Sequence, residues 1–248
     1  VTPLGKIHRV LQEFEPKPGA RLIISIDTRL QQKAFELLKG HKGALVALDP
    51  RTGEVLTMVS QPAFDPNLFV PRIPREVWRP LLNNPDAPLN NRAIQSSYAP
   101  GSIFKPLLAL EGLEQGLIST RTAVTCQGGY RLGTRTFRCW RHHGYVDFYK
   151  SIAMSCDVFY YLLGQKLGPE KIAETARAFG LGQATGIDLP HERKGLVPDP
   201  DWKRRVLKEP WYGGETLNYS IGQGYLHVTP LQMAVATMGI ANRGVMYR

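Results

Sequence analysis

Ser102 and Lys105 are spaced so that one could activate the other. They form the pattern S-x-x-K, and a step of three residues along a helix returns to the same face. A serine hydroxyl is a poor nucleophile until a neighbouring base takes its proton, and a lysine is a suitable base when burial or nearby charge lowers its pKa. Alone the pattern is weak, because a capping serine followed by an exposed lysine has the same spacing.

A second group with chemical potential is Ser155-Cys156-Asp157, on or just ahead of a predicted helix over residues 158–167. A hydroxyl and a carboxylate at this spacing could transfer a proton and hold a lysine in place. The alternative is a helix N-cap, with Ser155 or Asp157 accepting from backbone amides.

Three cysteines and one histidine form a third candidate site: Cys126, Cys139, His143 and Cys156. A Cys3His set is a known tetrahedral zinc site, and four protein ligands would make the zinc structural. Two alternatives stay open. One is a Cys126–Cys139 disulfide beside a buried free Cys156, as an oxidising compartment would favour, and the other is three inert thiols.

The elements that must position these residues follow from apolar periodicity and from Gly/Pro punctuation. Residues 21–27 are predicted to form a strand, and Thr28 is predicted to cap the helix that follows it in the chain. Residues 43–59 are predicted to form a hairpin around a Pro/Gly turn. Residues 61–100, 116–147 and 180–224 read as irregular. Four further helices are predicted, over residues 101–115, 149–167, 169–179 and 230–242. Early strands followed by many helices indicate an α+β fold.

Composition excludes several classes of function. The 248 residues carry a net charge of +10, but the positive charges are spread out, and no zinc finger, Arg-rich arm or RNP-like pattern accompanies them. A nucleic-acid partner is therefore not expected, and anionic lipid or an anionic lipid-linked substrate suits the charge better. No P-loop or GxGxxG pattern supports nucleotide binding.

Five ordered segments make the chain resemble the transpeptidase domain of class B penicillin-binding proteins. They are residues 44–56, 98–106, 155–161, 185–188 and 221–225. Asp157 at the third place of the second motif, with Trp211-Tyr-Gly-Gly-Glu215, is similar to the penicillin-binding protein 2 group of rod elongation.

The resemblance implies a penicillin-binding/serine β-lactamase-like fold, with an antiparallel sheet and an all-helical subdomain. It implies Ser102 as nucleophile, Lys105 as general base, Ser155 as proton relay, and Asp157 bonded to Lys105 and the substrate backbone. It also implies cross-linking of peptidoglycan stem peptides from a lipid-linked precursor, and trapping by β-lactam antibiotics. The implied location is the periplasmic face of the bacterial inner membrane, held by an N-terminal helix outside this sequence. A glycan polymerase and elongation-complex proteins are the implied partners, and some group members hold a zinc at equivalent places.

One departure from the family pattern is serious. The third motif, K-[ST]-G, is absent, and Arg193-Lys194-Gly195 is only a look-alike. Residues 1–19 are rich in proline and low in periodic pattern, so we expect residues 1–20 to be a linker or the remnant of an N-terminal pedestal region. Residues 21–248 are expected to be a transpeptidase domain without its closing strands, poorly active alone. A β-lactamase or D,D-carboxypeptidase of the same fold and a non-catalytic β-lactam or muropeptide sensor remain the alternatives.

Overall fold

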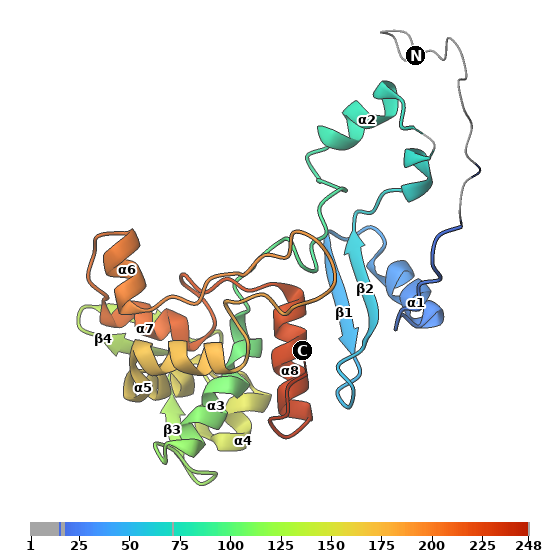
Figure 1. Ribbon diagram of the computed structural model, residues 1–248. Helices are drawn as coiled ribbons and strands as arrows, with labels where there is room; N and C mark the ends of the chain where they lie inside the picture. The colour runs from blue at the N-terminus through green and yellow to red at the C-terminus, as the bar shows by residue number, and fades with distance from the viewer. Residues whose placement is uncertain (1–14, 16–17, 71, 248) are drawn as a thin grey trace.

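A computed structural model describes residue 15, residues 18–70 and residues 72–247 (Figure 1). Most of the expected linker over residues 1–20 lies outside these described residues. In the described part of the chain, no helix is both long enough and apolar enough to cross a bilayer. The architecture is α+β, as expected from the sequence.

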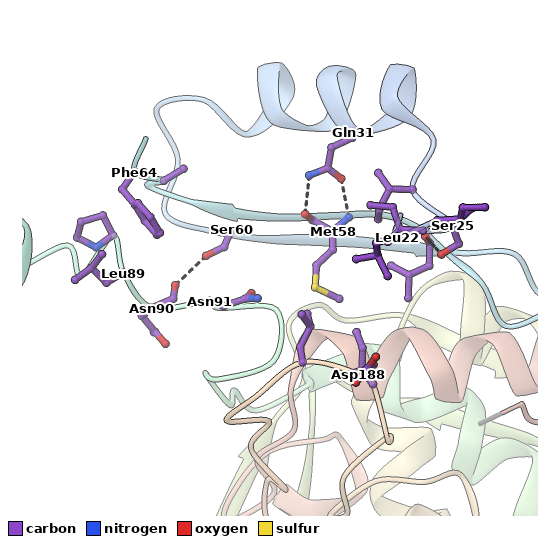
Figure 2. Close-up of a pocket in the computed structure, with 18 residues that line it drawn as sticks. Leu22, Ser25, Gln31, Met58, Ser60, Phe64, Leu89, Asn90, Asn91 and Asp188 are labelled. Carbon is purple, nitrogen blue, oxygen red and sulfur yellow. Dashed lines mark hydrogen bonds between the residues drawn. The ribbon is translucent and has the colours of Figure 1, made fainter. Parts of the chain in front are cut away.

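The predicted hairpin is confirmed as β1 (Gly43–Leu48) paired antiparallel with β2 (Val55–Gln61). Helix α1 (Thr28–Leu38) packs on β2, and α8 (Pro230–Ala241) packs on β1 (Figure 1). The side chain of Gln31 fastens α1 to the sheet, since it bonds both backbone groups of Met58, at 2.8 and 2.9 Å (Figure 2).

A helical body lies beside this hairpin (Figure 1). It contains α3 (Lys105–Glu114), α4 (Phe148–Ala153), α5 (Asp157–Ala178), α6 (Pro200–Val206) and α7 (Gly213–Ser220). Helix α5 packs against α3 and α7, and its backbone leaves helical geometry at Gly168, where the sequence predicts a break. The core between these helices is aromatic and aliphatic, with Phe104 stacked on Tyr219 at 6.1 Å between ring centroids.

The helical termini obey local rules read from the sequence. Thr229 caps α8 and Pro230 is its first residue, as predicted, and Gln232 completes a capping box.

Two antiparallel backbone hydrogen bonds between Tyr98 and Val228, both 2.9 Å, join the segment before α3 to the segment before α8. The helical body and the hairpin are thereby joined near Ser102.

The expectation of a strand over residues 21–27 is wrong. This segment runs beside β2 with two hydrogen bonds, from Ser25 Oγ to Val55 and from Asp27 N to Leu56, but makes no regular ladder. β-Branched residues favour extended backbone, but a strand also needs a paired partner along its length. The cap of α1 is Asp27 rather than Thr28, because the Asp27 carboxylate accepts from the first helical amides.

Three segments expected to be irregular contain regular elements. Residues 61–100 hold a 3-10 turn (Pro66–Phe69) and α2 (Arg75–Leu82), and residues 180–224 hold α6 and α7. Residues 116–147 form two small antiparallel pairs: β3 (Ala123–Cys126) with β6 (Gly144–Asp147), and β4 (Gly129–Leu132) with β5 (Arg135–Arg138). Such short elements draw their stability from tertiary packing, which local patterns do not display.

Asp199 joins α6 to α5 and sets a pH-dependent contribution to stability. Its carboxylate accepts from the amide of Trp202 at 2.7 Å and pairs with the guanidinium of Arg177. Burial raises the pKa of Asp199, but these bonds and charges more than offset it, and the pKa lies below 3.8. A carboxyl whose pKa falls on folding stabilises the protein above its unfolded pKa, and that contribution is lost as pH falls through the folded pKa.

Asp199→Ala is therefore expected to lower the free energy of unfolding by about 1–2 kcal/mol at neutral pH. The difference from the parent protein should shrink below about pH 4. Urea unfolding at about pH 7 and about pH 3 measures both. Asp201→Ala is the matched control, since Arg204, on the surface, is the one ion-pair partner of Asp201 among the described residues. An Asp199 effect of equal size at both pH values would contradict the prediction.

Candidate active site and metal cluster

Ser102 lies in a 3-10 turn, Gly101–Phe104, that leads directly into α3. The amide of Lys105 bonds the carbonyl of Ser102, and residues three apart in such a turn eclipse one another. The Ser102 side chain is exposed, and its hydroxyl has no hydrogen-bond partner within the described residues. The hydroxyl is therefore free to meet a ligand from solvent.

Lys105 is the buried centre of the site, with only 2% of its surface exposed. Its Nζ donates to Asp157 Oδ1 at 2.6 Å, to Ser155 Oγ at 3.0 Å and to the Ser155 carbonyl at 2.9 Å. Ser155 and Asp157 thus supply all the hydrogen-bond acceptors that Lys105 Nζ has among the described residues. The centre of the Tyr160 ring lies 5.4 Å from Lys105 Nζ. Burial raises the pKa of the Tyr160 phenol to about 12, so the ring remains neutral. Lys105 is thus held rigidly one turn beyond Ser102.

The second motif forms a sharp corner between α4 and α5. Ser155 adopts the left-handed region with φ +50°, a conformation that is costly for a residue with a Cβ. The indole of Trp140 holds the corner by donating to the carbonyls of Met154 and Ser155, at 3.1 and 3.2 Å. Neither the Ser155 nor the Asp157 side chain accepts from the first amides of α5 in the described structure, so the helix-cap alternative does not describe them. Both side chains face Lys105 instead.

Gly222 holds the other side of the turn and was not singled out from the sequence for this role. Its carbonyl accepts from Gly101 N at 2.8 Å. A Cβ on Gly222 would lie 2.2 Å from the Gly101 carbonyl oxygen, so no side chain fits there. Glycines that permit close backbone approach are recognisable in a sequence only when the opposing strand is known.

The four residues proposed as metal ligands are brought together. One donor atom each from Cys126, Cys139, His143 and Cys156 lie within 4.8 Å of one another, and all three cysteines are buried free thiols. His143 Nδ1 lies 3.5 Å from Sγ of both Cys126 and Cys139. Strands β3, β5 and β6 position three of these residues: Cys126 ends β3, Cys139 follows β5, and His143 precedes β6. All three lie within residues 116–147, which were expected to be irregular.

The geometry of the cluster fits a tetrahedral ion. Zinc–sulfur bonds of about 2.3 Å and zinc–nitrogen bonds of about 2.1 Å at a tetrahedral angle place sulfur and nitrogen about 3.6 Å apart. Burial raises the pKa of the Cys156 thiol to about 12, an environment in which a thiolate needs a cation beside it. For Cys126 the amides of His143 and Gly128 outweigh burial and lower the pKa of the thiol.

The cluster is joined directly to the second motif. Cys156 sits between Ser155 and Asp157, and the Asp157 amide donates to Cys139 Sγ at 3.3 Å. Trp140, next to Cys139, packs edge-on against His143 with ring centroids 5.1 Å apart. The backbone that presents Ser155 and Asp157 to Lys105 is therefore anchored on the cysteine cluster.

A large cavity lies away from these groups. It measures about 870 Å³ and lies between the β1–β2 hairpin, the segment before α1 and the loops around Asn90 and Asp188 (Figure 2). Its lining is mostly apolar, with Leu22, Met58 and Phe64 among its side chains (Figure 2). Neither the serine–lysine pair nor the cysteine cluster borders it. A smaller polar cavity of about 360 Å³ does border Asp157.

Comparisons with known proteins agree with the motifs. The family profile "Penicillin binding protein transpeptidase domain" matches residues 43–248. A peptidoglycan D,D-transpeptidase MrdA from Acinetobacter baumannii is 46% identical over 244 residues, which is 97% of this chain and 36% of that protein. The chain thus spans little more than a third of the length of that relative.

Solved structures give the same result. Penicillin-binding protein 2 (PBP2) from Pseudomonas aeruginosa, in complex with WCK 5153, is 41% identical with a TM-score of 0.87, covering 91% of this chain and 52% of that one. PBP2 from Helicobacter pylori, in complex with MreC, is 36% identical with a TM-score of 0.88, covering 98% of this chain and 46% of that one. From the profile match and these likenesses, the chain belongs to the penicillin-binding protein transpeptidase domain family.

Proposed function

We propose that this chain provides the acyl-transfer centre of a peptidoglycan D,D-transpeptidase that cross-links stem peptides and is a target of β-lactams. One observation carries the proposal: Lys105, one turn beyond Ser102, is buried against both Ser155 and Asp157. Two segments about 50 residues apart in sequence meet at one amine, and a purely structural lysine has no need of an exposed serine one turn before it.

The reaction follows from the roles of these groups. Ser102 Oγ bonds to the carbonyl carbon of the penultimate D-alanine, and the bond from that carbon to the terminal D-alanine nitrogen breaks. Lys105 acts as general base and takes the Ser102 proton, and Ser155, whose Oγ lies 3.0 Å from Lys105 Nζ, passes a proton to the departing amine. The amine of a second stem peptide then attacks the ester, which forms the cross-link and restores Ser102. Amides at the start of the turn add positive potential near the developing oxyanion.

Exposure of the protein, at its natural length, to a β-lactam tests this proposal. We expect one covalent adduct per protein in the intact mass, mapped by peptide digestion to Ser102. A long-lived adduct is expected of a transpeptidase, and rapid release with hydrolysed antibiotic would instead indicate a β-lactamase. Absence of an adduct, or an adduct on another residue, would refute the assignment of Ser102.

Gly222 offers a test of how closely the Ser102 turn must be held. In Gly222→Ala the new methyl would meet backbone atoms of Gly101 that cannot rotate away, so the turn must shift. A displacement of about 1 Å can cost about 10²-fold in rate, and we expect acylation by penicillin to fall by about 10- to 100-fold. Gly224→Ala is the control, because Gly224 has the same left-handed backbone but its Cβ would meet only Asn218 at 3.7 Å. Equal losses in both variants would show that backbone strain alone is responsible.

We also propose that Cys126, Cys139, His143 and Cys156 hold a structural zinc ion. The 3.5 Å contacts of His143 Nδ1 with two sulfurs and the free state of all three thiols support this set over a disulfide. With four protein ligands the metal would have no open position, so it would hold the Ser155–Asp157 corner and take no part in bond making.

The wider setting is proposed on the same basis. Asp27 and Gln31 bind β2, which supports a domain that begins near residue 21, ahead of the residues matched by the family profile. A protein of this activity would work at the periplasmic face of the inner membrane on a lipid-linked precursor. Since the H. pylori relative is in complex with MreC, we propose an elongation-complex partner of that kind, together with a glycan polymerase.

A further inference from the structure

The polar cavity beside Asp157 is built as a binding site for an anion. Its volume is about 360 Å³, and it is lined by β5 with the two residues after it, by the first turn of α5, and by the segment around α7 and Gly222. The side chains that supply its polar character are Arg135, Thr136, Arg138, Asn218 and Gln223. All of these can donate hydrogen bonds.

The charges around the cavity do not cancel. Asp157 is the one carboxylate in its lining, and Lys105 is paired with it. Neither Arg135 nor Arg138 has an acidic partner or a side-chain hydrogen bond within residues 18–70 and 72–247. The lining of this polar cavity therefore includes two arginines with no carboxylate to balance their charge, and a guanidinium fork matches the geometry of a carboxylate.

Strand β5, which carries these arginines, is held in place by packing and hydrogen bonds. The guanidinium of Arg135 lies 5.1 Å from the ring centre of Phe137, which is buried and packs edge-on against Tyr161. The Tyr161 hydroxyl donates to the carbonyl of Arg138 at 3.0 Å. A Cβ on Gly214 would come within 2.8 Å of the Phe137 ring, so α7 also presses closely on this strand. A positioned wall loses little entropy when it binds a ligand.

The cavity continues the candidate active site. Asp157 gives Oδ1 to Lys105 and borders the cavity, and its second oxygen has no partner among the described residues. That oxygen is free to accept from a backbone amide of the acyl donor. Gln223, on the opposite wall, follows the glycine that holds the Ser102 turn. A donor peptide that bonds Asp157 would thus carry its preceding side chains to the arginines.

We propose that Arg138 and Arg135 form a subsite for a carboxylate carried by the acyl donor on its side away from the scissile bond. This rests on the proposed acyl-transfer function and specifies which donors the site prefers. The preference would appear in the acylation step, before any acceptor amine enters.

The test compares two reporter donors, a pair of thioesters that end in D-alanine and differ only in a free carboxylate or a carboxamide on the preceding residue. We expect the protein at its natural length to acylate with the carboxylate donor about 10-fold or more faster in kcat/KM. Arg138→Gln should abolish this preference, because it slows the carboxylate donor far more than the carboxamide donor. Arg138→Lys should restore part of it, because the charge remains but the bidentate fork is lost.

Arg131→Gln is the matched control, since Arg131 belongs to the same β4–β5 pair but does not line the cavity. It should keep the full preference. An equal rate for both donors in the parent protein, or a preference that survives both Arg138→Gln and Arg135→Gln, would overturn the subsite while acylation of Ser102 still stood. Failure of every donor and of penicillin to acylate the parent protein would instead remove the proposed function itself.

Discussion

Ser102→Ala is expected to abolish covalent labelling by penicillin while leaving the fold intact. Loss of the nucleophile in a serine hydrolase costs about 10⁶-fold in rate, so no adduct should accumulate within hours. The free energy of unfolding should change by less than about 0.5 kcal/mol, because the Ser102 hydroxyl is exposed and has no hydrogen-bond partner in the described structure. Intact mass after exposure to the antibiotic and urea unfolding measure the two quantities.

Ser97→Ala is the matched control for this prediction. Ser97 lies five residues earlier, and its side chain makes no hydrogen bond within the described residues. It should label at the parent rate. Persistent labelling of the Ser102→Ala protein would show that the nucleophile is elsewhere, and the pairing of Lys105 with Ser155 and Asp157 would then need a structural explanation.

Loss of one cluster ligand is expected to have the second largest effect, on stability as well as on rate. Cys126→Ser should lower bound zinc from one equivalent per chain to a small fraction, since a neutral hydroxyl replaces a thiolate ligand. When free zinc exceeds its dissociation constant by about 1,000-fold, binding stabilises the native state by about 4 kcal/mol, and that contribution disappears with the site. Elemental analysis and thermal unfolding of the purified protein provide both measurements.

The effect on rate follows from where the cluster is attached. The Asp157 amide donates to Cys139 Sγ, and Cys156 lies inside the motif, so loss of the proposed zinc would free the strained Ser155 corner. Penicillin acylation should therefore slow in Cys126→Ser at temperatures where the protein is still folded. His142→Ala is the control, because His142 adjoins His143 but is not a member of the cluster. The metal site would be contradicted by a parent protein that is purified without chelator, contains no zinc and is no more stable than Cys126→Ser.

Local patterns were sufficient where the physics is local. Ser102 and Lys105 share a helical turn, so their spacing alone places them on one face. The β1–β2 hairpin follows from two apolar runs around a tight turn, and Thr229-Pro230 begins α8 because a cap followed by a proline satisfies the first helical amides. In each case the interacting groups are close in the chain.

Resemblance to a family supplied what spacing could not. Nothing in the spacing of residues 102, 105, 155 and 157 brings the second pair to the first, since about 50 residues separate them. The motifs named the partners, and the tertiary structure showed the contacts. The same holds for the cysteines, whose grouping depends on strands that sequence reasoning read as irregular.

Other features were decided by tertiary structure alone. Residues 21–27 have strand composition yet lack a ladder, because pairing is a property of the partner and not of the segment. The close contact of Gly222 with Gly101 joins positions distant in the chain, and so does the cavity that Arg138 and Asp157 both line. The sequence by itself thus determined which groups are present and the order of its local turns. Only the tertiary structure decided which of these groups come into contact. Contacts between distant segments depend on loop closure and on burial, and the local pattern of one segment does not indicate which other segment it will pack against.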